Sequence, residues 1–277
     1  MSERDEKAHP KSILEPETGT RLSAVEIHEN IRAPAEEEME RPFSALLFSS
    51  FAAGMLMGFS FLAAAFASSL APEHLKHAAA SAAYPLGFIF VVLGRSELFT
   101  ENTLEPVIPL LHNRDAKTLR GMLRLWGILL VGNLLGALVF GWVLAHTQMV
   151  EESLRPSLSH LAEKATSDGF GLTLYRGIFA GWLIALLAWL LASTRDSIAH
   201  IFLIWMLTAP ISAFHFRHSI AGAVEAFYRA AAGEASWGQL AGSFIVPAIL
   251  GNAIGGVVLV ALLNYGQIKE EHEEKHG

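Results

Sequence analysis

Long apolar runs separated by short polar stretches dominate the chain. Asp, Glu, Lys and Arg are all absent from residues 43–72, 78–94, 125–150, 177–194, 197–216 and 235–268. A helix needs roughly 20 apolar residues to cross a bilayer, and most of these windows reach or approach that length. The pattern predicts an all-α membrane protein with six transmembrane segments in residues 43–266, between a tail at 1–42 and a charged tail at 267–277.

Two polar stretches interrupt this pattern at membrane depth. Residues 94–102 read Gly-Arg-Ser-Glu-Leu-Phe-Thr-Glu-Asn, and residues 214–219 read Phe-His-Phe-Arg-His-Ser. Charged or irregular backbone survives in a bilayer only where protein or a water-filled cavity surrounds it. We therefore expect the second and fifth segments to be broken helices, which is typical of a transport pathway.

An internal repeat relates the two halves. Residues 131–138 (Val-Gly-Asn-Leu-Leu-Gly-Ala-Leu) match residues 250–257 (Leu-Gly-Asn-Ala-Ile-Gly-Gly-Val), and 51–54 resemble 178–181 at nearly the same offset. Three segments per copy is an odd number, so the second copy enters the membrane from the opposite side. The sequence thus predicts a 3+3 inverted repeat with its binding site near the midplane, and glycines spaced for close helix packing. Asn133 and Asn252 are the polar residues of this repeated motif.

Charge and composition narrow the class of protein. The formal net charge is −7, cysteine is absent and 52% of the residues are hydrophobic. These values exclude disulfide and thiolate-metal chemistry, and the acidic runs in the tails argue against a nucleic-acid partner. Lysine and arginine in short loops favour both termini in the cytoplasm, and the polar start predicts no signal peptide. Ser23 and Glu26 have the spacing of a helix capping box.

The charged groups of the two breaks are the candidate chemistry. Glu97 and Glu101 are expected to pair with Arg95 or Arg217, because a lone charge is costly at this depth. His215 and His218 flank Arg217, but nearby thiolate or carboxylate ligands for a metal are not evident, so we expect no metal. Histidine changes charge closest to neutral pH, which makes a histidine in a broken span a functional candidate.

Three motifs resemble those of the formate/nitrite transporter family. Residues 94–100 resemble its Gly-x-[Ser/Asp/Glu]-Leu-Phe-Thr signature, residues 216–221 (Phe-Arg-His-Ser-Ile-Ala) its Phe-Glu-His-Ser-Ile-Ala segment, and residues 251–256 (Gly-Asn-Ala-Ile-Gly-Gly) its last-span motif. The resemblance runs in the right order from about residue 43 to 265. Arg217 stands where the family usually has Glu, Gly222 where it has Asn, and Gly181 replaces a common Asn, so the chain resembles a divergent branch.

The resemblance implies an aquaporin-like protomer in a homopentamer of the bacterial inner membrane, with one pore per protomer. The implied substrates are small monovalent anions such as formate, nitrite or hydrosulfide, moved through a channel or together with H+. No cofactor is implied. The family's central pore histidine maps onto His218, and its loop onto Leu98, Phe99 and Thr100, with Phe216 beside the second break. Charges expected near the pore are Glu97, Arg217 and Arg176, the last by position alone.

Two other functions stay open at this point. The same scaffold can conduct a neutral or cationic small molecule, in which case Arg217 only pairs with Glu97, Glu101 or Glu225. A non-transporting membrane scaffold or sensor would use residues 1–42 to bind a partner. An enzyme is not expected, because no nucleophile, base and orienting residue occur at a recognisable spacing.

Overall fold

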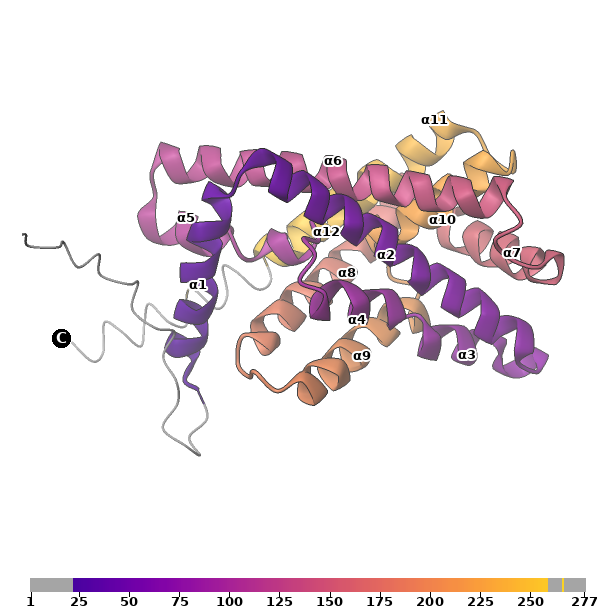
Figure 1. Ribbon diagram of the computed structural model, residues 1–277, viewed down its shortest axis with the longest axis horizontal. Helices are drawn as coiled ribbons and strands as arrows, with labels where there is room; N and C mark the ends of the chain where they lie inside the picture. The colour runs from indigo at the N-terminus through magenta and orange to yellow at the C-terminus, as the bar shows by residue number, and fades with distance from the viewer. Residues whose placement is uncertain (1–21, 259–265, 267–277) are drawn as a thin grey trace, which may run out of the picture.

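The computed structural model describes residues 22–258 and residue 266, and the tail at 267–277 and residues 1–21 of the other tail lie outside them. The described residues are helical, without strands (Figure 1). The helices are α1 Ala24–Glu40, α2 Phe43–Leu70, α3 Lys76–Ala83, α4 Leu86–Leu93, α5 Val107–Asn113, α6 Ala116–His146, α7 Arg155–Thr166, α8 Phe170–Leu191, α9 Ser197–Ala213, α10 Ser219–Ala231, α11 Trp237–Leu240 and α12 Val246–Gly256. A π-helical turn, Ala241–Ile245, joins α11 to α12.

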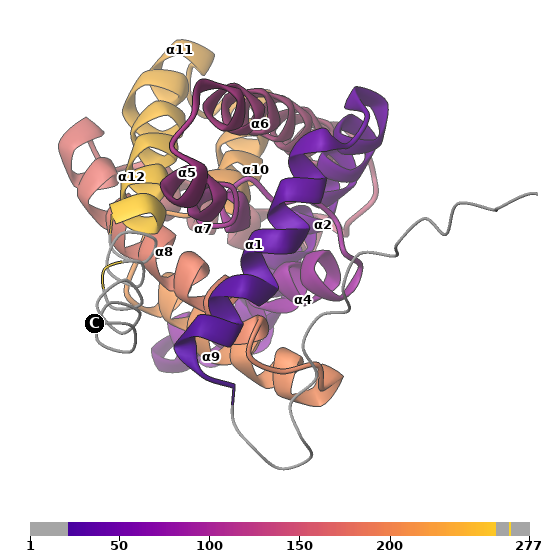
Figure 2. The same cartoon turned by 90° about the vertical axis from the view of Figure 1, so that its left-hand side faces the viewer.

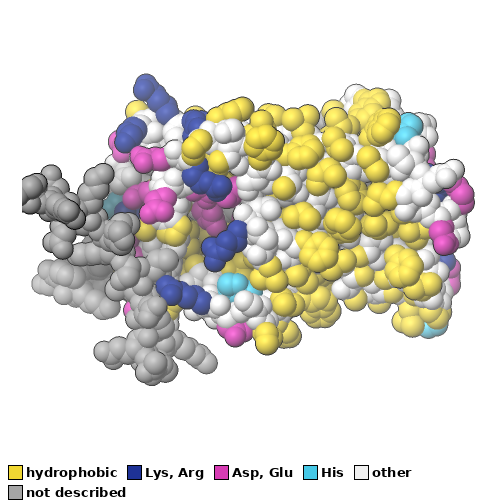
Figure 3. Space-filling model, in the orientation of Figure 1, with side chains coloured by type: hydrophobic (Ala, Val, Ile, Leu, Met, Phe, Trp, Pro, Cys, Tyr) yellow, Lys and Arg dark blue, Asp and Glu magenta, His cyan; other side chains and the backbone are white. Residues whose placement is uncertain are grey.

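Within the described residues, five helical stretches are long and apolar enough to cross a membrane: Phe43–Leu70, Glu73–Leu93, Ala116–His146, Phe170–Leu191 and Trp237–Gly256. Hydrophobic side chains form a belt around the middle of the molecule, and charged side chains gather at its two ends (Figure 3). The all-helical membrane fold expected from the sequence is confirmed. The count of six segments depends on treating α9, which is shorter, and α10 as halves of one span.

Helix α1 lies outside the bundle, across one of its ends (Figure 2). The capping box expected from the sequence is present: the Glu26 backbone N–H donates to Ser23 Oγ at 3.3 Å, and the Ser23 N–H donates to the Glu26 carboxylate at 2.7 Å. Ile31 and Met39 are buried against the main core. The tail at 1–42 therefore contains a helix that packs onto its own protein.

Glycines allow the helices of each half to touch backbone to backbone. A Cβ atom on Gly54 of α2 would overlap the Asn133 carbonyl of α6, and one on Gly181 of α8 would overlap the Asn252 carbonyl of α12. The crossings α2–α6 and α8–α12 are thus built from the same residues of the repeat. This correspondence supports the assignment of the repeat made from the sequence, with the paired small residues acting in packing.

Both broken spans end their first half-helix in the same way. Helix α4 ends before Gly94, and Arg95 then adopts a left-handed φ of 51°. Helix α9 ends before Phe214, and His215 adopts a left-handed φ of 56°. The next residue in each case donates its backbone N–H to a carbonyl of the last helical turn, Ser96 to Val91 and Phe216 to Ile211. A short non-helical stretch, residues 96–98 in the first break and 216–218 in the second, follows each of these turns.

Candidate functional site

The two breaks are each held by one buried asparagine, Asn133 or Asn252. Asn133 on α6 accepts a hydrogen bond from the Phe99 N–H at 2.8 Å and donates to the carbonyls of Glu97 (2.9 Å) and Ser50 (2.7 Å). The bonds to residues 97 and 99 satisfy backbone groups that a helix would otherwise pair, and the bond to the Ser50 carbonyl ties the break to α2. The side chain, fully buried, thereby replaces the missing turn of the first broken span.

Asn252 on α12 repeats this arrangement in the second half. It accepts from the Ser219 N–H at 2.8 Å and donates to the carbonyls of Arg217 (2.8 Å) and Gly177 (2.9 Å). Comparing the two sets of bonds makes Glu97 equivalent to Arg217, and Phe99 equivalent to Ser219. Leu98 and His218 are therefore equivalent positions of the two breaks.

The two breaks meet at a hydrogen bond between Thr100 and His218. Thr100 Oγ1 and His218 Nε2 are 2.8 Å apart, and both residues are buried. His218 Nδ1 accepts the Ala221 N–H at 3.1 Å, as the N-cap of α10. An acceptor nitrogen carries no proton, so neutral His218 has its hydrogen on Nε2 and donates it to Thr100. The bond leaves the threonine hydroxyl hydrogen available to a further acceptor.

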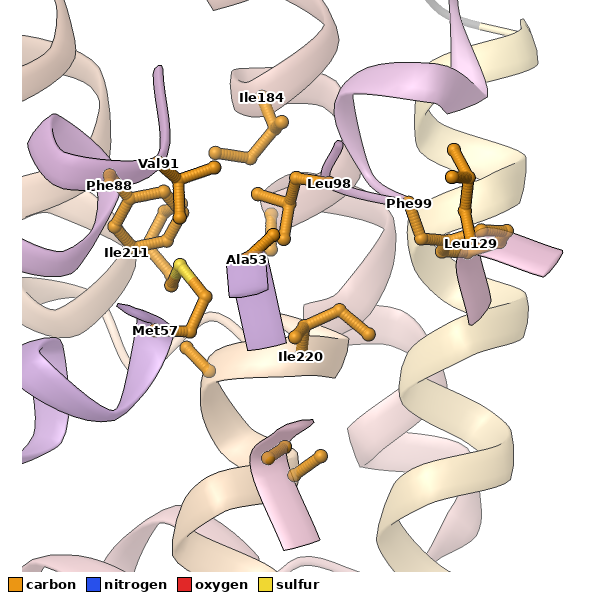
Figure 4. Packing of buried hydrophobic residues seen from close by; sticks show 14 of the residues in the cluster. Ala53, Met57, Phe88, Val91, Leu98, Phe99, Leu129, Ile184, Ile211 and Ile220 are labelled. Atoms are coloured by element: carbon orange, nitrogen blue, oxygen red, sulfur yellow. The ribbon is translucent and has the colours of Figure 1, made fainter. Parts of the chain in front are cut away.

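Apolar side chains surround this junction. Phe88 packs edge-on against the His218 ring, with centroids 4.9 Å apart. Leu98 is fully buried and points toward Ala53 and Ile220, whereas Phe99 points away, toward Leu129 on α6 (Figure 4). The surroundings of Thr100 and His218 are thus low in polarity, which strengthens any hydrogen bond made there.

Phe99 and Phe216 occupy different surroundings. The Phe99 ring packs against Trp126 of α6 at a centroid distance of 6.0 Å, and Phe99 is outside the lining of the cavities described below. Phe216 lines the cavity beside His218 and stacks on Phe179 of α8 at 5.2 Å. The Phe216 ring therefore borders the cavity, whereas the Phe99 side chain contributes to the packing of the first break.

Arg217 pairs with Asp168, so the expected pairing with Glu97 or Glu101 is wrong. Its Nη2 is 2.7 Å from Asp168 Oδ2, and Arg176 Nη1 is 2.7 Å from the same oxygen. Arg217 also donates to the Lys164 carbonyl at 3.1 Å. The two breaks lie on opposite sides of the junction, which separates Arg217 from the carboxylates of the first break. Asp168 was not identified from the sequence.

Glu97 makes the corresponding ion pair in the first half. It pairs with Arg41, just before the first long helix, as Asp168 lies just before α8. Each partner stands two residues ahead of a phenylalanine that begins a long helix, Phe43 or Phe170. The equivalent positions of Arg41 and Asp168 in the two halves are the sequence signal that could have identified them as the ion-pair partners of the two breaks.

A cavity of about 60 Å³ lies on the α7 side of the junction. His218, Arg217 and Phe216 line it together with residues of α3, α7 and α10. Its lining includes groups from both halves of the chain. The buried His218 ring forms part of its wall.

A second cavity, of about 270 Å³, lies under α1 and next to the first break. Its lining includes the carboxyl groups of Glu38, Glu97, Glu101 and Glu105, together with Arg95. Burial raises the pKa of the Glu38 carboxyl far above its usual value of 4.5, and a hydrogen bond with Glu97 raises it further. Helix α1 thus places a carboxyl of raised pKa against the first break.

Metal binding finds no support in the described ranges: residues 22–258 and 266 contain no group of three or more His, Cys, Asp or Glu side chains placed to hold a metal ion. His215 stacks on His77 with ring centroids 4.6 Å apart, instead of converging with His218 on a common point. The polar groups at the junction are suited to hydrogen bonding with a small solute.

Known proteins resemble this chain in sequence and in fold. The family model described as formate/nitrite transporter matches residues 25–266. "Inner membrane protein YfdC" of Escherichia coli is 31% identical over 99% of this chain and 88% of its own length. "Formate channel BtFdhC" of Bacillus thuringiensis is 28% identical over 85% of this chain and 92% of its own. A solved "pentameric formate channel with formate bound" superposes with a TM-score of 0.71 at 21% identity, over 82% of this chain and 97% of that one. Because the family model matches residues 25–266 and a relative is 31% identical over nearly the whole chain, this chain belongs to the formate/nitrite transporter family.

Proposed function

We propose that the protein conducts small monovalent anions of the formate, nitrite or hydrosulfide type across the bacterial inner membrane. The observation that carries this proposal is the Thr100–His218 bond, which joins the two breaks of the repeat in an apolar setting beside a cavity. Relatives named as formate channels support the substrate class. The pore residues of the proposal are His218, Thr100, Leu98 and Phe216.

The apolar junction disfavours a bare ion, so an anion gains by taking up a proton on the way. Moving a charge through low dielectric is costly, whereas the neutral acid of a weak-acid anion crosses at a smaller cost. His218 and Thr100 form a hydrogen-bonded pair that can pass a proton between water and the permeant. Proton coupling through His218 is the mode of transport that we propose.

A homopentamer with both termini in the cytoplasm completes the proposal. The solved neighbour named as a pentameric channel supports the assembly. Large apolar side chains such as Phe48, Phe202 and Ile198 are exposed on the single chain, which leaves apolar surface for lipid and for neighbouring protomers.

Flux measurements on purified protein in liposomes test the proposal. Formate, nitrite and hydrosulfide should be taken up, and His218→Asn should change the dependence of the maximal rate on pH while keeping the fold. Superimposable pH profiles for His218→Asn and the native protein would remove proton coupling through His218. Absence of flux for all three anions would remove the function itself.

A neutral or cationic permeant is the second candidate function, and one observation favours it. Four carboxyl groups line the cavity under α1, on the path toward the first break. Any of them that is ionised attracts cations and repels anions, although the charge of Glu97 is already balanced by Arg41. Ammonium and water flux, measured beside formate flux in the same liposomes, separates the two: uptake of ammonium without formate would favour this candidate.

A further inference from the structure

Glu225 is a carboxyl group inside the cavity beside His218. It lies on α10, which begins at Ser219, and it lines the same cavity as His218 and Gly222. Positions 218, 222 and 225 follow the spacing of a single helix face. Gly222, between the two, has no side chain, and the Phe244 ring packs at this point. Glu225 and His218 therefore share one wall of the cavity.

No counter-ion is paired with Glu225 among the described residues. The structure gives its carboxyl neither a hydrogen bond nor an ion pair with another described side chain. Arg217, which lines the same cavity, is bound to Asp168 through Nε at 2.9 Å and to the Lys164 carbonyl through Nη2 at 3.1 Å. Arg217 therefore attracts the Glu225 carboxyl across the cavity that both residues line, but it forms its direct bonds with Asp168 and Lys164.

Other titratable and charged groups face the same space from each neighbouring element. Helix α3 and the turn that follows it, helix α7 and the second break contribute them, namely His77, Tyr84, Lys164, His215, Arg217 and His218. Helix α2 and the π-helical turn before α12 contribute only apolar side chains, Ala64 and Phe244. Glu225 is the acidic member of this set.

An anion that enters this cavity meets the carboxyl at close range. An ionised carboxylate about 4 Å from the anion would lower its occupancy by about a thousandfold at the effective dielectric of a protein surface. A proton held between the two removes one negative charge and replaces the repulsion with a strong O–H···O⁻ hydrogen bond. Occupancy therefore depends on a proton at this position.

We propose that Glu225 is a specificity-determining residue of the pore, which binds each entering anion through its protonated carboxyl. The inference rests on the proposed conduction of small anions. The Glu225 O–H donates its hydrogen bond to an oxygen of the permeant, and no covalent bond is formed or broken. Anions of weak acids share such a proton well, whereas anions of strong acids such as nitrate are poor acceptors. The cavity thus selects formate-like anions before they reach His218.

The Michaelis constant for formate uptake isolates this step. One proton accompanies each bound anion, so KM of the native protein should rise about tenfold per pH unit once Glu225 ionises, by linkage. Glu225→Gln should give a KM that stays nearly constant from pH 5 to pH 8, and its preference for formate over nitrate at pH 5 should fall by about tenfold or more. His218→Asn should act on the maximal rate and leave the slope of KM in place.

Controls make each outcome decisive. Glu163→Gln, a matched change on α7 at a side chain that is 65% exposed, should leave KM and its pH slope unchanged. Protein-free liposomes correct for diffusion of formic acid. Glu225→Asp keeps an acid in place and should keep the slope, which serves as the test should Glu225→Gln fail to assemble.

The inference and the proposed function fail in different ways. Formate uptake by Glu225→Gln with the KM slope and selectivity of the native protein would overturn the role of Glu225 and leave anion conduction standing. A flat KM profile in Glu225→Asp would overturn it as well. Absence of formate and nitrate uptake by the native protein would overturn the proposed function, and the inference with it.

Discussion

The two asparagines that hold the breaks are expected to be the most sensitive polar residues of the fold. Asn133→Ala and Asn252→Ala each remove three hydrogen bonds of 2.7–2.9 Å. Each change leaves one N–H and one carbonyl of the break unpaired, whereas the other carbonyl, of Ser50 or Gly177, lies within a helix and keeps its intrahelical donor. At roughly 1 kcal/mol per lost bond, the loss is about 3 kcal/mol for either variant.

Aspartate separates hydrogen bonding from packing at these positions. Asn133→Asp and Asn252→Asp keep the side-chain volume and the accepting oxygen, but replace the two N–H donors with an oxygen. In Asn252→Asp this oxygen would face the carbonyls of Gly177 and Arg217, at the 2.8–2.9 Å of the present bonds. The expected loss is about 2 kcal/mol, from two bonds at roughly 1 kcal/mol each.

Thermal unfolding in detergent, followed by size-exclusion chromatography, measures these losses. Each 1 kcal/mol lowers the melting temperature of a protein of this size by roughly 2 to 4 °C, so the alanine variants should lose about 6 °C or more. Asn102→Ala is the matched control, because Asn102 is equally buried but donates only two long bonds, of 3.3 and 3.4 Å. The reasoning is refuted if the Asp and Ala variants at 133 and 252 melt no lower than Asn102→Ala.

Three further predictions follow from the packing and charge of the structure. Gly181→Ala should lower the free energy of unfolding by several kcal/mol and disrupt assembly, because its Cβ would overlap the backbone of Asn252. Gly127→Ala has open space around it and should be neutral or slightly stabilising. Thermal unfolding of the two variants compares these effects. Docking of α1 should weaken as pH rises from about 5 to 9, because the pKa of Glu38 is higher in the docked state and ionisation destabilises that state. Hydrogen exchange of the α1 amides should become faster over this pH range. Glu38→Gln should remove this dependence on pH. Asp168→Asn should leave Arg217 without its carboxylate partner and lower stability by about 3 kcal/mol, and a melting temperature equal to that of the native protein would contradict this.

The sequence was sufficient for the fold because the membrane constrains it strongly. Charge-free windows, the two polar breaks and the repeated Gly-Asn motif predict an all-helical inverted repeat, and the structure has that arrangement. The length of α9 was harder to judge. Its charge-free window at 197–216 has the length of a span, but α9 ends at Ala213, and α10 continues after the break that the sequence predicts at 214–219.

The partners of the charged residues could not be obtained from the sequence. Charge alone made Glu97 and Glu101 reasonable partners for Arg217, but opposite signs do not report which face of the membrane a group occupies. The actual partner, Asp168, follows α7 in a polar connection, where a carboxylate is usually a solvated surface group. Geometry was also needed to see that Phe99 turns toward Trp126 while its neighbour Leu98 turns toward the junction.

The two ion pairs of the breaks have opposite polarity, and this has an electrical consequence. Glu97 carries the negative charge in the first break and Arg41 the positive charge outside it, whereas Arg217 is positive in the second break and Asp168 negative outside it. A two-fold axis in the membrane plane reverses the direction of a dipole along the membrane normal, so identical pairs in the two halves would cancel. Exchanging the signs in one half makes the two dipoles point the same way and add. We therefore expect an anion current through the protein to rectify, passing more readily in one direction than in the other.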